Sequence, residues 1–179
     1  MKTLDQKQPN QIKSTSLPEN EKDKYLQFGK YTRDCPEWLL DKASAIDNSK
    51  IDEAYIEKIL SVIIDEFNIK KHEITRTNDF RQSRFISVVD ILEKRQNSCG
   101  SLATVVASVL RTLKIPTKLI HGFYKKNNPN MRHAWNEVYL EDHWVPFDIT
   151  HRNFKLDEFN LKESEALDWE DMEKDYNPA

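Results

Sequence analysis

Three residues of this sequence, Cys99, His133 and Asp148, are of the types that carry out thiol catalysis. In such chemistry a cysteine thiolate attacks a carbonyl carbon, an imidazole takes up and returns a proton, and a carboxylate orients the imidazole. Cys99 lies in the stretch RQNSCGSLATVVASVL, directly before an apolar run. A free cysteine is also commonly a small buried residue, so Cys99 by itself leaves both interpretations open.

The apolar residues after Cys99 predict a helix that begins at the cysteine. They recur with a 3.6-residue period at positions 102, 105, 106, 109, 110 and 113. Ser98 is the expected N-cap and Pro116 marks the stop. Asn97 suits the left-handed backbone that a sharp turn into a helix often needs. At a helix start the unpaired N–H groups and the macrodipole lower the pKa of a thiol and can receive an oxyanion.

Two strand-like runs, HAWNEVYL and HWVPFDIT, carry the histidine and the aspartate. If Glu141 and Asp142 form a two-residue turn between them, Trp135 pairs with Asp148, and His133 lies one diagonal step away on the same face. Diagonal neighbours are about 7–8 Å apart at the backbone, which allows a carboxylate-to-imidazole hydrogen bond. A turn changed by one residue would place the two side chains on opposite faces. Trp135 could then shield the ion pair from water or be a core aromatic.

The remaining histidines are less suited to act as the base. His121 lies inside the predicted strand TKLIHGFY and is interpreted as structural, whereas His143 faces away from the aspartate in this register. His151 lies just past the second run, and His72 lies in a polar loop. A zinc site formed by Cys99, His133 and one of these histidines lacks ligand-pair spacing. We therefore expect neither a metal nor a cofactor.

With 179 residues the chain is long enough for one ordinary domain. We expect a disordered N-terminal arm over 1–20, a single catalytic domain over 21–154 and an acidic C-terminal tail over 155–179. The tail has nine Asp and Glu residues against three Lys, a net charge of −6, and is expected to be solvated and partly helical. Apolar periodicity predicts further elements in the domain: helices at 51–67 and 86–92 and a strand at 117–124.

Composition excludes several classes of protein. A formal net charge of −3 gives no reason to expect a nucleic-acid partner. No run of 18 apolar residues exists, so no membrane partner is expected. The N-terminal stretch MKTLDQKQPNQIKSTS lacks the apolar segment of a secretory signal, which predicts a cytoplasmic protein if Met1 is the natural start. In that compartment Cys35 and Cys99 are expected to be free thiols.

The motifs ILEKRQNSC, SLATVVASVLRTLKIP, HAWNEVYL and HWVPFDIT resemble the transglutaminase-like superfamily of papain-like thiol enzymes. The resemblance is close over residues 87–150. It implies an α+β fold in which N-terminal helices and the nucleophile-bearing helix pack on an antiparallel sheet. It also implies that Cys99, His133 and Asp148 form the catalytic triad. Two positions depart from the pattern, because Asn97 and Lys114 stand where many members have glycine.

The resemblance implies acyl transfer through a thioester on amide bonds of a protein or peptide substrate. It leaves hydrolysis, deamidation and transamidation open. Two alternatives are a catalytically silent binding module of the same fold and a glycan-removing amidase of the same superfamily. The backbone N–H of Cys99 is the expected oxyanion donor, and Gln96 is a candidate for the second.

Overall fold

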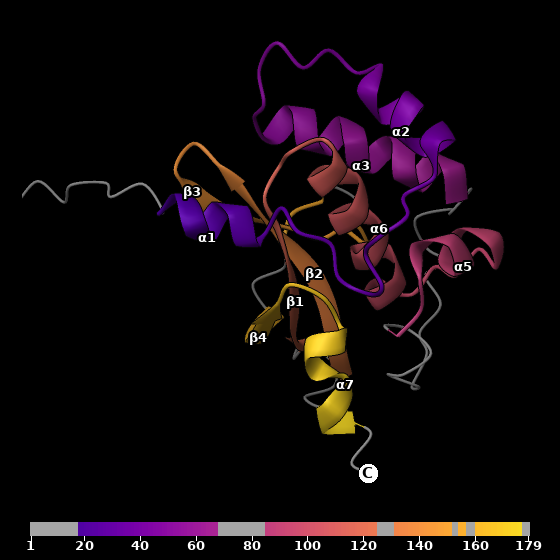
Figure 1. The fold of residues 1–179 in the computed structure, drawn as a ribbon, viewed down its shortest axis with the longest axis vertical. Coiled ribbons are helices and arrows are strands. Elements are labelled where there is room, and N and C mark those ends of the chain that lie inside the picture. Colours follow the sequence, from indigo (N-terminus) through magenta and orange to yellow (C-terminus); the bar gives the residue numbers. More distant parts are fainter. Residues whose placement is uncertain (1–17, 68–84, 125–130, 152–153, 157–159, 177–179) are drawn as a thin grey trace, which may run out of the picture.

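The computed structural model describes residues 18–67, 85–124, 131–151, 154–156 and 160–176. It has an α+β architecture, as the sequence predicted, with helices packed on one antiparallel sheet (Figure 1). In chain order the elements are α1 (Glu19–Lys24), α2 (Glu37–Ser44), α3 (Glu53–Phe67), α5 (Val88–Glu93), α6 (Cys99–Thr112), β1 (Thr117–Tyr124), β2 (Met131–Leu140), β3 (His143–Phe147), β4 (Asn160–Ala166) and α7 (Glu170–Tyr176).

The sheet has the strand order β3-β2-β1-β4, with antiparallel neighbours throughout. Leu140 pairs with His143 and the same register continues to Phe147, so the predicted two-residue turn is confirmed. Both turn residues have positive φ, as the tight turns of β-hairpins require. β3 is the edge strand, where the missing N–H of Pro146 is tolerated. It ends at Phe147, three residues earlier than the sequence pattern suggested.

Helix α6 lies between the sheet and the helices α2, α3 and α5 (Figure 1). It contacts β1 and β2 on one side, and all of its residues from Gly100 to Arg111 are buried. The Asn136 side-chain amide of β2 donates to the Ala103 carbonyl of α6 at 3.1 Å, which ties the first half of the helix to the strand. Burial on every side fixes the position of the helix start relative to β2.

The two ends of α6 are made by local backbone features. Ser98 is the N-cap, as predicted, and its hydroxyl accepts a hydrogen bond from the Ser101 N–H. The left-handed residue ahead of the helix is Arg95, with φ 49°, and not Asn97 as the sequence suggested. The reason is that the turn occurs directly after α5, where the Gln96 N–H bonds the Ile91 carbonyl. At the other end Lys114 has φ 64°, so this lysine takes the conformation that glycine adopts more easily.

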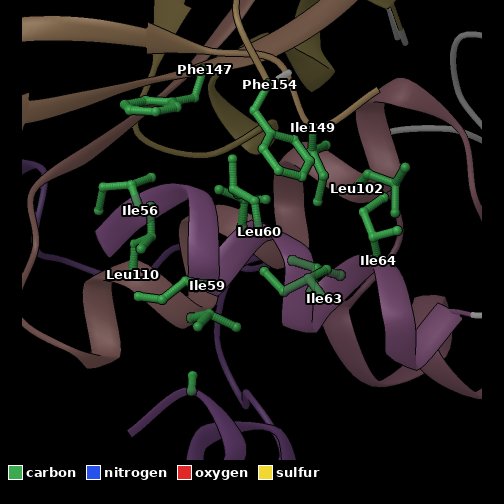
Figure 2. Packing of buried hydrophobic residues seen from close by; sticks show 14 of the residues in the cluster. Ile56, Ile59, Leu60, Ile63, Ile64, Leu102, Leu110, Phe147, Ile149 and Phe154 are labelled. Carbon is green, nitrogen blue, oxygen red and sulfur yellow. The ribbon is translucent and has the colours of Figure 1, made fainter. Parts of the chain in front are cut away.

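The segment after β3 is anchored in the main core. Phe147, Ile149 and Phe154 are almost fully buried, and Figure 2 shows their side chains directed toward Leu60 of α3. Asp148 lies within this segment, and its N–H donates to the Phe154 carbonyl at 2.8 Å. Apolar side chains on both sides of the aspartate therefore hold it in place.

The acidic C-terminal segment contributes to the sheet and core, which corrects the expectation of a solvated tail, whereas the expectation that it is partly helical is confirmed by α7. Residues 160–166 form strand β4 beside β1, and the helical part begins only at Glu170. Trp169 is fully buried, and its indole N–H donates to the Thr104 hydroxyl at 2.8 Å. Asp168 accepts hydrogen bonds from the backbone N–H groups of Tyr31 and Thr32. Burial of the indole outweighs the solvation preference of the surrounding acidic residues.

Candidate active site

Cys99 is the first residue of α6 and is partly buried. It packs against a buried cluster to which Ala103 of the same helix, Ala134 of β2 and Trp169 contribute. A helix start concentrates unpaired N–H groups and the positive end of the macrodipole, both of which favour a negative charge on sulfur or on a nearby oxygen. The fold thus places the thiol where a thiolate is stabilised.

His133 and Asp148 are joined by a short hydrogen bond, with 2.6 Å between Nε2 of the imidazole and Oδ2 of the carboxylate. The imidazole is mostly buried, with 13% of its side chain exposed, and the carboxylate is fully buried. Burial by itself lowers the pKa of His133. The charge and hydrogen bond of Asp148, followed by those of Cys99, outweigh it and raise the pKa to about 10. The structure therefore brings the three residues singled out in the sequence into one interacting group.

Asp148 is held in its ionised form by donors on both carboxylate oxygens. Burial alone would raise its pKa, but the charge and hydrogen bond of His133 lower it, with smaller contributions from His151 and Thr150. Oδ1 accepts from the Thr150 N–H at 2.9 Å and from the Thr150 hydroxyl at 2.6 Å. Sequence reasoning did not give Thr150 a role. The signal was present, because Asp followed two residues later by Thr is typical of a side-chain-capped turn.

The His133 ring is enclosed by other aromatic rings. Trp135 stacks on it with centroids 6.0 Å apart and planes at 30°, and His151 stacks with centroids 6.3 Å apart and planes at 23°. Tyr124 approaches at 6.4 Å in an edge-on orientation. Trp135 is only 1% exposed. Trp135 is therefore a core aromatic, as one of the two interpretations expected, and its ring stacks on the imidazole.

His151 is a member of the site that the sequence did not identify. Its Nδ1 lies 2.9 Å from the Lys155 carbonyl oxygen, and its Nε2 lies 3.7 Å from Oδ2 of Asp148. His121 is buried inside β1, in agreement with a structural role, and His143 is exposed near the hairpin turn. His72 lies outside the described residues. No local pattern predicted the His151 contact, because it depends on how the chain turns after β3.

The two cysteines have different environments. Cys35 is a free, partly buried thiol, and burial raises its pKa to about 11, with a smaller opposing effect from the nearby Ser108 side chain. Cys99 interacts with an imidazole whose pKa is raised, so an imidazolium faces it in the neutral pH range. By electrostatic reciprocity the same contact favours the thiolate of Cys99. The two thiols therefore differ in their electrostatic environment, since burial dominates at Cys35 and an imidazolium faces Cys99.

The side chain of Gln96, the candidate for a second oxyanion donor, lies near the start of α6. The Gln96 side-chain oxygen faces the Ser101 hydroxyl at 3.4 Å, which places this amide against the first turn of α6. Within the described part of the chain, no group of three or more His, Cys, Asp or Glu side chains has an arrangement suited to a metal ion. Over the same residues, no helix is long and apolar enough to cross a membrane.

Comparison with known proteins adds independent information. A structure of a candidate cysteine protease from Cytophaga hutchinsonii aligns with a TM-score of 0.62 at 22% identity, over 86% of this chain and 50% of that chain. Two structures of the periplasmic domain of TgpA from Pseudomonas aeruginosa, one bound to ethylmercury, both give TM-scores of 0.48. Their identities are 20% and 19%, over 75% and 77% of this chain and 48% and 51% of theirs.

This chain spans about half the length of these solved structures. At 22% identity the likeness to the Cytophaga hutchinsonii structure concerns the fold alone. No curated protein matches the chain significantly. The model of the transglutaminase-like superfamily matches residues 41–149, which is more than half of the chain and includes α3, α6 and the hairpin with Asp148. The chain belongs to the transglutaminase-like superfamily.

Proposed function

We propose that the protein is a cysteine-dependent acyl-transfer enzyme that acts on amide bonds of proteins or peptides. The observation that carries the proposal is the 2.6 Å bond between His133 and the buried Asp148, with Cys99 interacting with the same imidazole. A binding module has no physical need for a buried carboxylate–imidazole pair, because burying charged groups costs free energy unless each is compensated. A thiol nucleophile does need this pair, since it supplies and orients the base.

In the first half of the reaction the thiolate of Cys99 adds to the carbonyl carbon of the amide. The C–S bond forms while the carbonyl π electrons move to oxygen, and N–H groups at the start of α6 stabilise the oxyanion. The intermediate then collapses as the C–N bond breaks. The leaving nitrogen takes the proton of the His133 imidazolium, so that a thioester and an amine are formed.

In the second half the neutral His133 accepts a proton from water or from an incoming amine. The deprotonated oxygen or nitrogen attacks the thioester carbonyl, the C–S bond breaks, and Cys99 leaves as the thiolate. Water gives a carboxylic acid, and an amine gives a new amide. Asp148 stays charged throughout and stabilises the imidazolium each time it forms.

Peptide bonds and glutamine carboxamides are the first amides to test. The solved structure from Cytophaga hutchinsonii is described as a candidate cysteine protease, which favours peptide bonds as one substrate class. The test is incubation with glutamine-containing peptides, with and without a primary amine, followed by mass spectrometry. A cleaved, deamidated or amine-linked product identifies the reaction, and a mass adduct on Cys99 after acid quenching identifies the thioester.

Two cysteine variants serve as a matched pair in this experiment. Cys99→Ser is expected to form neither product nor adduct, whereas Cys35→Ser is expected to behave like the parent protein, because the Cys35 thiol is held protonated by burial. Product formation by Cys99→Ser at the parent rate refutes the proposal. If no peptide is converted and Cys99 is alkylated no faster than Cys35, the alternative of a catalytically silent binding module is supported.

A further inference from the structure

The side chain of His151 has a geometry that the three proposed catalytic residues do not account for. Its ring stacks on His133 on one side, while Trp135 also stacks on the His133 ring. Its Nε2 lies 3.7 Å from Oδ2 of Asp148, the same oxygen that accepts the hydrogen bond of His133. Two imidazoles therefore share one buried carboxylate oxygen.

The tautomer of His151 follows from its other nitrogen. A carbonyl oxygen can only accept, so Nδ1 carries the hydrogen that is donated to the Lys155 carbonyl at 2.9 Å. In the neutral ring Nε2 is then an unprotonated nitrogen whose lone pair faces the carboxylate, which is an unfavourable contact. In the protonated ring Nε2 carries a hydrogen, and the contact becomes an attraction between opposite charges.

We propose that His151 is a positioning residue of this site, whose imidazolium form shares Oδ2 of Asp148 with His133 and keeps the carboxylate charged as the pH falls. The inference rests on the proposed function, because it concerns the ion pair on which acyl transfer depends. Asp148 and His133 are titratable groups that face the His151 ring. The smaller contribution of His151 to the lowered pKa of Asp148 agrees with this role.

The side chain of His151 is 28% exposed, compared with 13% for His133. The His151 ring is therefore in contact with solvent, whereas the His133 ring is largely enclosed. A positive charge on His151 also lies close to the His133 imidazolium, so the two cations repel each other while both are attracted to Asp148. Both cations stabilise the ionised form of Asp148, so the carboxylate remains ionised at a lower pH than it would with His133 alone.

The experiment follows the His133–Asp148 bond directly and needs no amide turnover. The low-field proton resonance of His133 Nε2–H is recorded as a function of pH, together with the rate at which iodoacetamide alkylates Cys99 in a Cys35→Ser background. His151→Phe keeps a stacking ring without a charge, whereas His151→Lys keeps a cation without the ring. His143→Phe is the matched control, because the exposed His143 also contacts a backbone carbonyl, that of Glu141.

As the pH is lowered, the His133 resonance disappears and the alkylation rate of Cys99 falls at some acid limit. In His151→Phe we expect this acid limit to lie about half a pH unit or more above that of the parent, as for loss of a partly exposed ion pair. His151→Lys and His143→Phe are expected to match the parent. Identical acid limits in His151→Phe and the parent overturn the inference. The inference is also overturned if the acid limit of His151→Lys rises as much as that of His151→Phe. His151→Gln replaces the phenylalanine variant if that variant fails to melt cooperatively. Because both measurements are independent of amide turnover, an inactive enzyme with a shifted acid limit would refute the proposed function and leave the inference standing.

Discussion

Replacing Asp148 by asparagine removes the charge on which the reactivity of Cys99 depends. The pKa of His133 is raised from 6.5 to about 10, which corresponds to about 5 kcal/mol at about 1.4 kcal/mol per pH unit. The carboxylate is fully buried and 13% of the imidazole side chain is exposed, so solvent screens the pair little. Without the charge, the burial that lowers the pKa of His133 dominates, and the imidazole is neutral at pH 7.

The asparagine also reverses the hydrogen bond to the base. The Thr150 N–H and hydroxyl both donate to Oδ1, so the amide oxygen of an asparagine is expected to stay on that side. Its NH₂ group then faces Nε2 of His133 and donates to it. The proton of the neutral imidazole then sits on Nδ1. A protonated Nδ1 has no free lone pair, so this nitrogen cannot accept the thiol proton of Cys99. Charge and tautomer therefore change in the same unfavourable direction.

The assay is alkylation of Cys99 by iodoacetamide between pH 5 and pH 9, in a Cys35→Ser background. A thiol with the ordinary pKa of about 8.5 is about 3% ionised at pH 7. With a parent Cys99 that is almost fully thiolate at this pH, Asp148→Asn is expected to react about 30-fold more slowly. Asp142→Asn in the exposed hairpin turn is the matched control and should leave the rate unchanged. A rate for Asp148→Asn within about threefold of the parent at pH 7 would refute the reasoning.

Three further changes test the site and the fold. Thr150→Val removes the 2.6 Å hydroxyl donor to Asp148 but keeps the backbone donor, and it should lower the free energy of unfolding by about 1–2 kcal/mol in urea titrations; an unchanged midpoint would contradict this. A Cβ on Gly122 would lie 2.0 Å from the Leu161 carbonyl oxygen, so Gly122→Ala should weaken β4 pairing and lower the melting temperature by several degrees; a melting temperature equal to that of the parent would argue against this. The raised pKa of His133 stabilises the fold fully below pH 6.5 and loses this effect as the pH rises toward 10. Melting temperatures of the parent should therefore fall more over that interval than those of His133→Gln, and parallel curves would disprove the linkage.

The sequence predicted those features that depend on a few consecutive residues. The apolar period after Cys99 predicted α6, because a helix buried between a sheet and other helices must be apolar on the faces it buries. The two-residue turn fixed the hairpin register, because the side-chain period of a strand leaves one register that buries the correct face. The hairpin register predicted the contact between His133 and Asp148, although Asp148 lies one residue past the end of β3 and does not pair with Trp135 as expected. The motifs around Cys99, His133 and Asp148 also pointed to the superfamily that the family model matches.

Features that depend on distant parts of the chain were not predicted. Sequence charge suggested a solvated tail, but whether Trp169 is buried depends on the space beside Thr104, about which residues 155–179 carry no information. The left-handed residue before α6 is Arg95, because the end of α5 sets the path of the turn. His151 reaches Asp148 only because Phe147, Ile149 and Phe154 anchor the chain on both sides of the aspartate.

The sequence by itself determined which residues can do chemistry and which elements carry them, since residue type and periodicity are local properties. The tertiary structure decided the electrostatics of the site. A pKa depends on burial and on every charge within a few ångströms, and those neighbours come from α6, from β2 and from the segment after β3. The second imidazole on Asp148 arises in the same way, because packing of the whole domain brings it to the carboxylate.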